Sequence, residues 1–495
     1  MKRIAKKTLP NIIYIAIFLI VSLVPVIFFS DKQAAIGNET KADKPKLSDG
    51  TLITANIDAY FAQNFGFRNR LVYAGNALKQ AVFKTSGQSD VIIGEDGWLF
   101  YGRALDDFLG TSILGEVELD RMGAVVDMMQ QYVQLHGGEF IFVSAPNKMS
   151  VYGEYMPYYY VEEKASGNYE LFYERLTELG VNAVQLKNVL IAKKLDGVQL
   201  YHKLDSHWNN YGAAVAYEAM ADKLAKLYGE EYSGYTHYSE LPYNVKNNFS
   251  GDLQAMLLPG SNKKDEQVEF DIDEKFEYVN RFRGVDDLVI ASANQTAAVD
   301  KMVTLFRDSF GNALYWFFAN EYTSLTAKRE IPYNIYQAAA ESDLVVIELV
   351  ERNLKGLLQH TPIIASWNLG GDYFDNIELD SKQVLDVDFY VNTTADGLMQ
   401  ISGSDDFLED YSYIYVRIKH MEASDKTEQD DSYKDGADES VVYQLLLGEG
   451  GDFTFYLEQA DADILKADDG SSEYSFILKN SDGYVEIPIN VTLQD

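Results

Sequence analysis

The chain of 495 residues contains no cysteine. This absence excludes disulfide bonds, thiolate metal ligands and a cysteine nucleophile. Positive charge is scarce as well, because 42 Lys and Arg stand against 76 Asp and Glu and give a formal net charge of −34. A surface with this excess of negative charge repels phosphate backbones, so we expect no nucleic-acid partner.

The negative charge is concentrated near the C-terminus. Residues 371–495 hold 30 Asp or Glu and 7 Lys or Arg. The simplest interpretation is a solvated extracellular surface. The alternative is a divalent-cation site built by Asp461, Asp463, Asp468 and Asp469, although their spacing does not match an EF-hand loop.

A basic start followed by a long apolar run marks the N-terminus. Lys2, Arg3, Lys6 and Lys7 precede the segment 12–29, which has eighteen residues and no charge. About 20 apolar residues cross a bilayer core, and flanking cations stay in the cytoplasm. We therefore predict a single-pass anchor within residues 1–30, a linker over 31–50, and an extracellular remainder. A signal peptide cleaved near residues 34–35 is the alternative, and it sends the rest of the chain to the same side.

Short apolar runs alternate with helical segments between about residues 115 and 355. This pattern is typical of an α/β domain with a doubly wound, mainly parallel sheet, which we place at residues 51–370. One helix is expected over 56–83 and a turn into an aromatic strand over 94–101. Later strands are expected at 139–144, 183–186, 302–306 and 344–349, and helices at 119–135, 169–179, 210–228 and 310–319.

The pattern of apolar and polar residues changes after about residue 375. Alternating segments at 384–391, 413–418 and 474–478 lie between Gly, Asp and Ser turns. A period of two indicates strands with one buried face. We therefore predict an acidic antiparallel β-sandwich over residues 371–495.

A serine stands where an apolar strand turns into a helix, in the segment Leu305-Phe306-Arg307-Asp308-Ser309-Phe310-Gly311-Asn312. A serine hydroxyl attacks a carbonyl only when a base takes its proton, and the free N–H groups of a helix start stabilise an oxyanion. The simpler interpretation is helix capping by Asp308 or Ser309.

The base and its orienting carboxylate stand about a hundred residues earlier, in Leu204-Asp205-Ser206-His207-Trp208. In an extended Asp-x-His segment both side chains lie on one face, so Asp205 can hold the imidazole of His207 while the other ring nitrogen faces a serine. A surface loop with a capping Asp is the alternative. A metal site at His202, Asp205 and His207 is a third interpretation, but no further ligand cluster supports it, and we predict neither metal nor cofactor.

Three other residues are candidates for contacts with substrate. Lys148 follows the strand ending at Ser144, and the Gly251 N–H lies in a turn where it could join an oxyanion hole. Arg352 follows the strand over 344–349. The simpler interpretation is a solvated loop side chain for Lys148 and a plain turn for Gly251. For Arg352 the alternative is a buried ion pair with Glu351 that supports the site.

These segments together resemble the alginate-acetylation and DHHW-type branch of the SGNH hydrolase superfamily. The pieces that match, in the order of that family, are the anchor, Gly94–Tyr101, Pro146-Asn147-Lys148, Asp205-Ser206-His207-Trp208 and Arg307-Asp308-Ser309-Phe310. As in that branch, the Asp-x-His motif precedes the serine. One departure is Arg307, where many SGNH enzymes have glycine before Asp-Ser.

The resemblance implies a function as well as a fold. It implies that Asp205, His207 and Ser309 form a catalytic triad that transfers O-acetyl groups to an exported polysaccharide, with acetyl delivered by a membrane-bound O-acyltransferase. The C-terminal domain is similar to the carbohydrate-binding module of some relatives and would hold the glycan. A carbohydrate esterase, or a non-catalytic protein that binds wall polymers, are the alternatives.

Overall fold

The fold was taken from a computed structural model of the chain. It describes residues 2–32, 35–36, 39–46, 53–161, 167–375, 377, 380–381, 384–419, 440–466 and 472–494. Of the four acids considered for a cation site, Asp468 and Asp469 lie outside these residues, as does the side chain of Asp463.

Three helices form the N-terminal part, namely α1 (Lys2–Ile27), α2 (Ile53–Asn64) and α3 (Arg68–Phe83). The single helix expected over 56–83 is wrong, because the chain turns at Gly66 and Phe67. A side chain at Gly66 would place its Cβ 2.6 Å from the Cβ of Phe28, and Phe67 adopts a φ of 60°. Within the described ranges, no helix meets the length and apolarity that a bilayer crossing requires, so the anchor stays a prediction.

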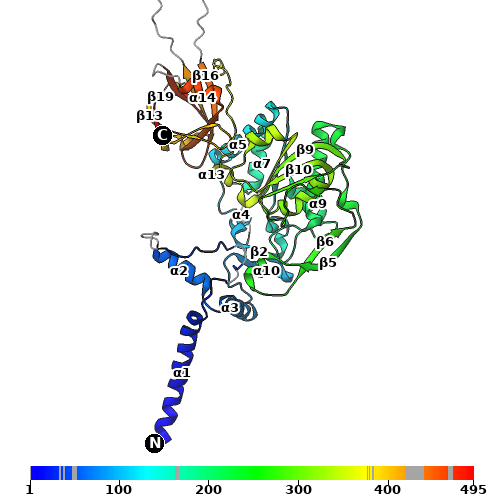
Figure 1. The fold of residues 1–495 in the computed structure, drawn as a ribbon, viewed down its shortest axis with the longest axis vertical. Helices are drawn as coiled ribbons and strands as arrows, with labels where there is room; N and C mark the ends of the chain where they lie inside the picture. The colour runs from blue at the N-terminus through cyan, green and yellow to red at the C-terminus, as the bar shows by residue number, and fades with distance from the viewer. Residues whose placement is uncertain are drawn as a thin grey trace, which may run out of the picture.

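A seven-stranded sheet forms the centre of the next part (Figure 1). Its order is β4-β3-β11-β9-β10-β8-β7, and the first five strands are mutually parallel while β8 and β7 run antiparallel to their neighbours. The strands are β3 (Glu139–Ala145), β4 (Ala183–Gln185), β7 (Glu277–Tyr278), β8 (Val289–Ala293), β9 (Val299–Phe306), β10 (Tyr322–Lys328) and β11 (Leu344–Val350). The predicted mainly parallel sheet is confirmed.

Helices cover both faces of this sheet, because both faces of each central strand are apolar. Phe140 and Phe142 of β3 belong to one core with α5 (Glu116–Leu135), α7 (Asn168–Glu178) and α12 (Ile335–Glu341). Ile141 and Val143 belong to the opposite core with α8 (Leu186–Lys194), α9 (Asn210–Tyr228) and α11 (Gly311–Glu321). This alternation of cores produces the doubly wound arrangement.

Smaller elements connect and flank the main strands and helices. The hairpins are β1 (Val91–Ile93) with β2 (Leu99–Tyr101), and β5 (Tyr243–Phe249) with β6 (Asp265–Phe270). The short α-helices are α4 (Leu105–Leu109), α6 (Lys148–Val151), α10 (Asp252–Leu257) and α13 (Gly356–Gln359). The 3₁₀ turns are η2 (Glu95–Gly97), η3 (Gly102–Ala104), η4 (Gly153–Tyr155), η5 (Glu230–Tyr232), η6 (Tyr238–Glu240) and η7 (Glu351–Asn353).

The C-terminal part is one sheet that closes on itself. Its order is β12-β19-β13-β14-β17-β16-β15-β18, and β18 pairs again with β19. The elements are β12 (Asp380–Ser381), β13 (Leu385–Thr393), β14 (Met399–Ser404), η8 (Asp406–Asp410), β15 (Tyr413–Lys419), β16 (Ser440–Leu447), β17 (Asp452–Leu457), α14 (Gln459–Lys466), β18 (Glu473–Asn480) and β19 (Gly483–Gln494). The predicted two-sheet sandwich is wrong in this respect. Alternation reveals a buried face but does not reveal how the strands pair, and β13 and β19 are parallel.

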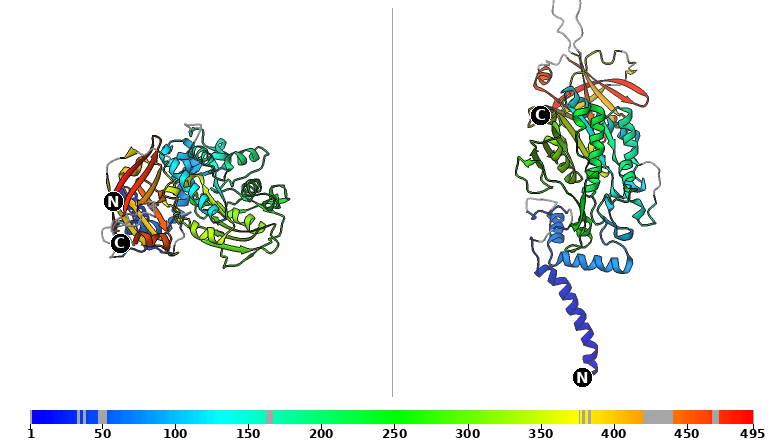
Figure 2. Two further views of the ribbon diagram at one scale, coloured as in Figure 1. Left: turned by 90° about the horizontal axis from the view of Figure 1, so that it is seen from above. Right: turned by 90° about the vertical axis from the view of Figure 1, so that its right-hand side faces the viewer.

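The seven-stranded sheet domain and the closed C-terminal sheet share a buried junction. Arg121 of α5 is 3% exposed, and its guanidinium donates to the backbone carbonyls of Leu408, Glu409, Tyr411, Gly448 and Gly450. Leu398, Leu446 and Tyr456 of the closed sheet also pack into the core beneath α5. Figures 1 and 2 show the closed sheet at the end of the molecule opposite α1.

Candidate active site

The turn between β9 and α11 carries Ser309. Its neighbour Asp308 fixes the turn, since one carboxylate oxygen accepts from the Phe310 N–H at 2.8 Å and the other accepts from the Val350 N–H at 2.9 Å. The stabilising contacts of this helix start are therefore made by Asp308. The Ser309 side chain is half-buried and is left to another partner.

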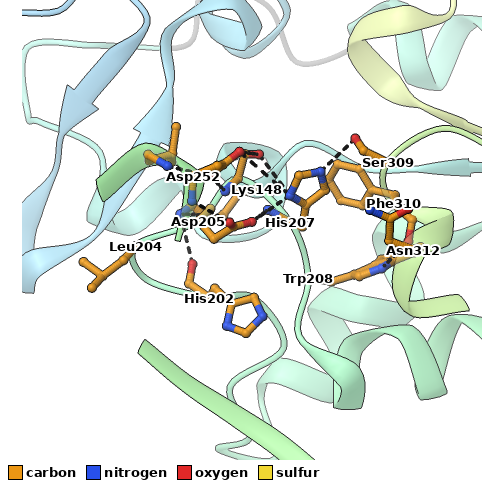
Figure 3. Close-up of polar contacts among 12 residues, drawn as sticks. Lys148, His202, Leu204, Asp205, His207, Trp208, Asp252, Ser309, Phe310 and Asn312 are labelled. Carbon is orange, nitrogen blue, oxygen red and sulfur yellow. Dashed lines mark hydrogen bonds and ion pairs between the residues drawn. The ribbon is translucent and has the colours of Figure 1, made fainter. Parts of the chain in front are cut away.

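That partner is His207, on the loop before α9. The Nε2 atom of His207 lies 2.8 Å from the Ser309 hydroxyl, and its Nδ1 lies 2.6 Å from a carboxylate oxygen of Asp205 (Figure 3). A carboxylate only accepts hydrogen bonds, so Nδ1 carries the proton and Nε2 is left to accept from Ser309. The structure thus brings all three residues of the predicted triad into one hydrogen-bonded chain.

The loop that carries Asp205 and His207 is folded tightly on itself. The His207 N–H donates to the Asp205 carboxylate at 2.9 Å, which holds the Asp-x-His segment in a turn. Tyr201 and Trp208 pair across the base of the loop, and the Trp208 indole N–H donates to the Phe310 carbonyl at 3.0 Å. This last bond connects the histidine loop directly to the serine turn.

Lys148 follows strand β3, as predicted, but its side chain is buried instead of exposed to substrate. Its ammonium is buried beneath the loop and donates to the carbonyls of His202, Lys203 and Asp205 at 3.0, 3.2 and 2.6 Å. Burial lowers the pKa of Lys148 to about 8, while nearby carboxylates, Asp205 first, act in the opposite direction. The prediction that Lys148 contacts substrate is therefore wrong, because its side chain is used to hold the loop that carries Asp205 and His207.

Gly251 packs against the loop that carries Asp205 and His207, whereas a contact with the oxyanion was predicted. A Cβ at this position would lie 2.1 Å from the Leu204 carbonyl oxygen, so only glycine permits the approach of the two chains. The approach lets the N–H of Asp252 donate to Asp205 at 2.7 Å. The predicted substrate role of Gly251 is thus replaced by a packing role behind Asp205.

A second carboxylate, Asp252, lies behind the histidine. Ser206 donates to it twice, from its hydroxyl at 2.6 Å and from its N–H at 2.8 Å. A carboxylate oxygen of Asp252 lies 3.9 Å from His207 Nδ1. Neither Asp252 nor Ser206 was predicted as a site residue from the sequence. The only available signal was the position of Asp252 directly after the singled-out Gly251.

Arg352 is the third predicted substrate residue, and it lies near the triad. Its guanidinium stands 5.4 Å from the Phe310 ring centre and 5.2 Å from that of Tyr101, and it donates to the Asn147 side chain at 3.2 Å. Its positive charge acts to lower the pKa of His207. Arg352 therefore remains a candidate for contact with a substrate oxygen.

The electrostatics of the three acid–base groups follow from burial and pairing. Burial by itself would raise the pKa of Asp205, but the charge and hydrogen bond of His207 hold it well below its usual range. Burial would lower the pKa of His207, but the charge of Asp205, their hydrogen bond and Asp252 raise it overall. Burial, with the charge of Asp205, raises the pKa of Asp252 to about 6.

One group of potential metal ligands occurs among the described residues, namely Asp205, His207 and Asp252. Their donor atoms are already committed to each other, because Nδ1 of His207 is in direct hydrogen-bond contact with Asp205 at 2.6 Å. His202 points away and bonds the Glu266 carbonyl at 2.8 Å while its ring stacks on Phe249. The arrangement fits proton transfer better than metal ligation.

A cavity of about 510 Å³ opens beside the serine turn. It is lined by Arg307, Asp308, Ile331, Tyr333, Leu349, Arg352, Asn353, Lys355, Gly356, Gln359 and His360. Arg307 is itself engaged, because it bonds Asn312 and the carbonyls of Val285 and Asp287. The cavity thus reaches Asp308, the residue before Ser309, while none of the three triad residues lines it.

Comparison with known proteins agrees with this geometry. Residues 91–324 match the family model described as SGNH hydrolase-like domain, acetyltransferase AlgX. This segment is an SGNH hydrolase-like domain of the AlgJ/AlgX type. The family resemblance inferred from the motifs is thereby confirmed.

Individual relatives are similar to parts of this chain. The probable alginate O-acetylase AlgJ of Pseudomonas fluorescens is 23% identical over 215 residues, which are 43% of this chain and 52% of that protein. AlgJ of Pseudomonas putida is 28% identical over 140 residues, 28% of this chain and 35% of that protein. The solved O-acetyltransferase domain of Pseudomonas putida AlgJ is 20% identical, with a TM-score of 0.36, over 54% of this chain and 92% of that one. The chain spans about half the length, or less, of these curated relatives.

Proposed function

We propose that the chain is an extracytoplasmic O-acetyltransferase that modifies a cell-surface or exported polysaccharide through an acetyl-Ser309 intermediate. The observation that carries the proposal is the continuous chain from Asp205 to His207 to Ser309, with contacts of 2.6 and 2.8 Å. Three groups at these distances can move a proton off a serine hydroxyl and return it. The similarity to proteins named alginate O-acetylase supports acetyl as the transferred group.

In the first half-reaction, Ser309 Oγ attacks the carbonyl carbon of an acetyl donor while His207 Nε2 takes the hydroxyl proton. Asp205 holds the resulting imidazolium in place and stabilises its charge. Collapse of the tetrahedral intermediate breaks the bond to the donor oxygen, and His207 gives its proton to that leaving group. The acetyl group is then an ester of Ser309.

The oxyanion of the intermediate needs donors near Ser309. Among the residues that the structure describes, the Ser309 N–H has no hydrogen-bond partner, so it can donate to the oxyanion. It lies at the start of α11, whose dipole favours negative charge. Arg352, whose guanidinium lies 5.4 Å from the ring centre of Phe310, is the candidate for a second, charged donor.

In the second half-reaction, a sugar hydroxyl attacks the acetyl carbonyl carbon while His207 Nε2 takes its proton. The ester bond to Ser309 Oγ then breaks, and His207 returns the proton to the serine oxygen. The cavity beside Asp308 and Arg352 supports an acceptor of sugar size. The proposed donor is a membrane-bound O-acyltransferase, and the proposed location is the outer side of the cell membrane, with the apolar residues 12–29 as anchor. The closed C-terminal sheet would help to hold the polymer.

Two alternatives use the same residues differently. A carbohydrate esterase would pass acetyl from Ser309 to water, so acceptor glycan would not become acetylated. A non-catalytic binding protein would keep the fold without turnover. The bond between Ser309 and His207 favours an enzyme over a binding protein, because a binding protein has no need for that alignment.

The test is a transfer assay with purified chain, an activated acetyl ester and a panel of glucan, mannuronan and wall-polymer oligosaccharides. We expect acetylated oligosaccharide from the native chain and at least about a thousandfold less from Ser309→Ala. Release of acetate without acetylated glycan would identify the esterase. Equal product from the native chain and Ser309→Ala would contradict the proposed mechanism.

A further inference from the structure

Helix α3 has an apolar face that nothing in the described chain covers. Asn76 marks the opposite face, since it is buried and donates to the Leu257 carbonyl of α10 at 2.6 Å. At about 100° per residue, the residues opposite Asn76 form a stripe along the helix. The large members of this stripe, each 40–64% exposed, are Phe67, Leu71, Leu78 and Val82. Gly75, beside the stripe, likewise faces open space.

Positive residues border this apolar stripe. Arg70 and Lys84 lie on one side of it and Lys79 on the other, and all three are exposed. Residues 53–84 contain four Lys or Arg and one Asp, in a chain whose net charge is −34. This segment is thus a local reversal of the overall charge, and an apolar face bordered by long cations is typical of a helix that lies in a membrane interface.

The position of α3 fits the same partner. Gly66 donates to the Pro25 carbonyl at 2.7 Å, and the rings of Phe28 and Phe67 lie 5.1 Å apart, so the end of α1 is tied to the start of α3. Figure 2 shows α3 lying across the base of the globular part while α1 leads away from it. The large apolar side chains of the segment that leads into this junction, from Ile12 to Phe29, are exposed as well.

We propose that α3 lies flat on the surface of an anionic lipid bilayer, with its apolar stripe among the acyl chains and its cations at the headgroups. The charge reversal favours lipid over a second copy of this acidic chain, because two copies would bring like charges together at the same face. The proposal concerns docking and does not depend on the proposed acetyl transfer.

Docking of α3 would also orient the candidate active site. The α10 helix, on which Asn76 rests, begins at Asp252, and the Asp252 N–H donates to Asp205. Figure 1 places α10 and β2 beside α3, at the end of the globular part from which α1 leaves. The triad would therefore stand close to the lipid surface, where a membrane-bound acetyl donor could reach it.

The absence of native cysteine allows a direct test. Leu78→Cys and Leu135→Cys each introduce one thiol for an environment-sensitive fluorophore into the full chain, at leucines that are 64% and 61% exposed. Leu135 ends α5, next to the start of β3 and thus at the edge of the sheet opposite the triad. Both proteins are reconstituted in phosphatidylcholine vesicles with phosphatidylglycerol, and quenching by acyl-chain-brominated lipid is measured. A circular dichroism melt of each labelled protein verifies the fold.

We expect about threefold stronger quenching at residue 78 than at residue 135. This difference should be lost when phosphatidylglycerol is omitted and when the chain also carries Lys79→Glu and Lys84→Glu. Equal quenching at the two positions would overturn the proposal. Disulfide formation between Leu78→Cys chains in detergent, with no quenching in vesicles, would instead identify a second copy as the occupant and would also overturn it. Catalytic activity enters neither outcome.

Discussion

The sheet domain and the closed C-terminal sheet differ in the burial of their acidic side chains. In the sheet domain, buried carboxylates such as Asp205, Asp265 and Glu351 each accept hydrogen bonds from nearby donors. Over the described part of residues 384–494, the buried polar side chains are Ser412 and Arg417, and no carboxylate is buried. The C-terminal acids therefore stay at the surface, although this region carries most of the net charge.

The difference has a physical reason. Burying a carboxylate costs several kcal/mol unless donors replace its water, so such a group persists where the chain is organised around it. Around Asp205 the chain provides two backbone N–H groups and His207 for this purpose. Negative charge on the closed sheet is solvated and needs no such support. Among the described residues, buried carboxylates are thus confined to the sheet domain.

The strongest test of this contrast replaces the central buried carboxylate. Asp205→Asn should lower the rate of acylation by about 10³- to 10⁴-fold, because the amide cannot hold the required tautomer of His207 or stabilise its charge. Acylation by an activated acetyl ester, followed by stopped-flow absorbance, measures this effect. Asp265→Asn is the matched control, since Asp265 accepts from the Leu204 N–H but does not contact His207, and it should reduce the rate far less. Equal losses in both variants would mean that the loop fold alone matters.

The next test separates the two regions. Arg121→Met removes a guanidinium that donates to five carbonyls of the closed sheet, and we expect a loss of about 4 kcal/mol of unfolding free energy. Calorimetry should then show two transitions in place of one. Arg103→Met, which removes an exposed ion pair with Asp90, is the control and should change stability by less than about 1 kcal/mol. A single unchanged transition in Arg121→Met would show that the apolar junction suffices.

The support beneath the histidine loop should be weaker but measurable. Lys148→Met leaves the carbonyls of residues 202, 203 and 205 without their donor and should cost about 3 kcal/mol of unfolding free energy. Because burial lowers the pKa of Lys148 to about 8, the unfolded chain holds this proton at higher pH than the folded chain does. The native protein should therefore gain stability from pH 8 towards 10.5, and denaturant titrations should show that gain to be smaller in Lys148→Met. An identical pH dependence in both proteins would contradict the assignment.

The smallest predicted effect concerns Asp252. Its charge helps to raise the pKa of His207, and the neutral imidazole is the base that acylation requires. Asp252→Asn should therefore move the acid limb of the rate profile to lower pH, by about 0.5 unit. The control Ser206→Ala keeps both carboxylates and removes a neutral hydroxyl that donates to Asp252 and lies 3.2 Å from His207 Nδ1, so its limb should move less. An acid limb that moves to higher pH in Asp252→Asn would refute the electrostatic role.

Much of the α/β domain could be predicted from sequence. The strands over 139–144 and 344–349 are apolar on both faces, and this pattern by itself indicates a parallel sheet between two helical layers. The closed C-terminal sheet could not be predicted, because the pairing of β18 with β19 depends on long-range contacts that leave the alternation unchanged. The break between α2 and α3 was missed because its cause is the packing of Phe28 against Gly66.

The candidate site shows the same division. Asp205, His207 and Ser309 could be found because their chemistry is visible in residue type and in the strand-to-helix context. Lys148 and Gly251 were identified as important positions, but their roles were not, because both act through backbone carbonyls that carry no sequence signal. Asp252 was missed because it begins the separate helix α10 and approaches His207 only in the folded chain.

The central claim is that Ser309 receives an acetyl group with His207 as base. Intact-protein mass spectrometry with peptide mapping, after brief exposure to an activated acetyl ester and acid quench, tests it most directly. We expect one acetyl adduct on Ser309 in the native chain, and none at that residue in His207→Ala. Acetylation confined to lysines, or an equal Ser309 adduct in both proteins, would contradict it.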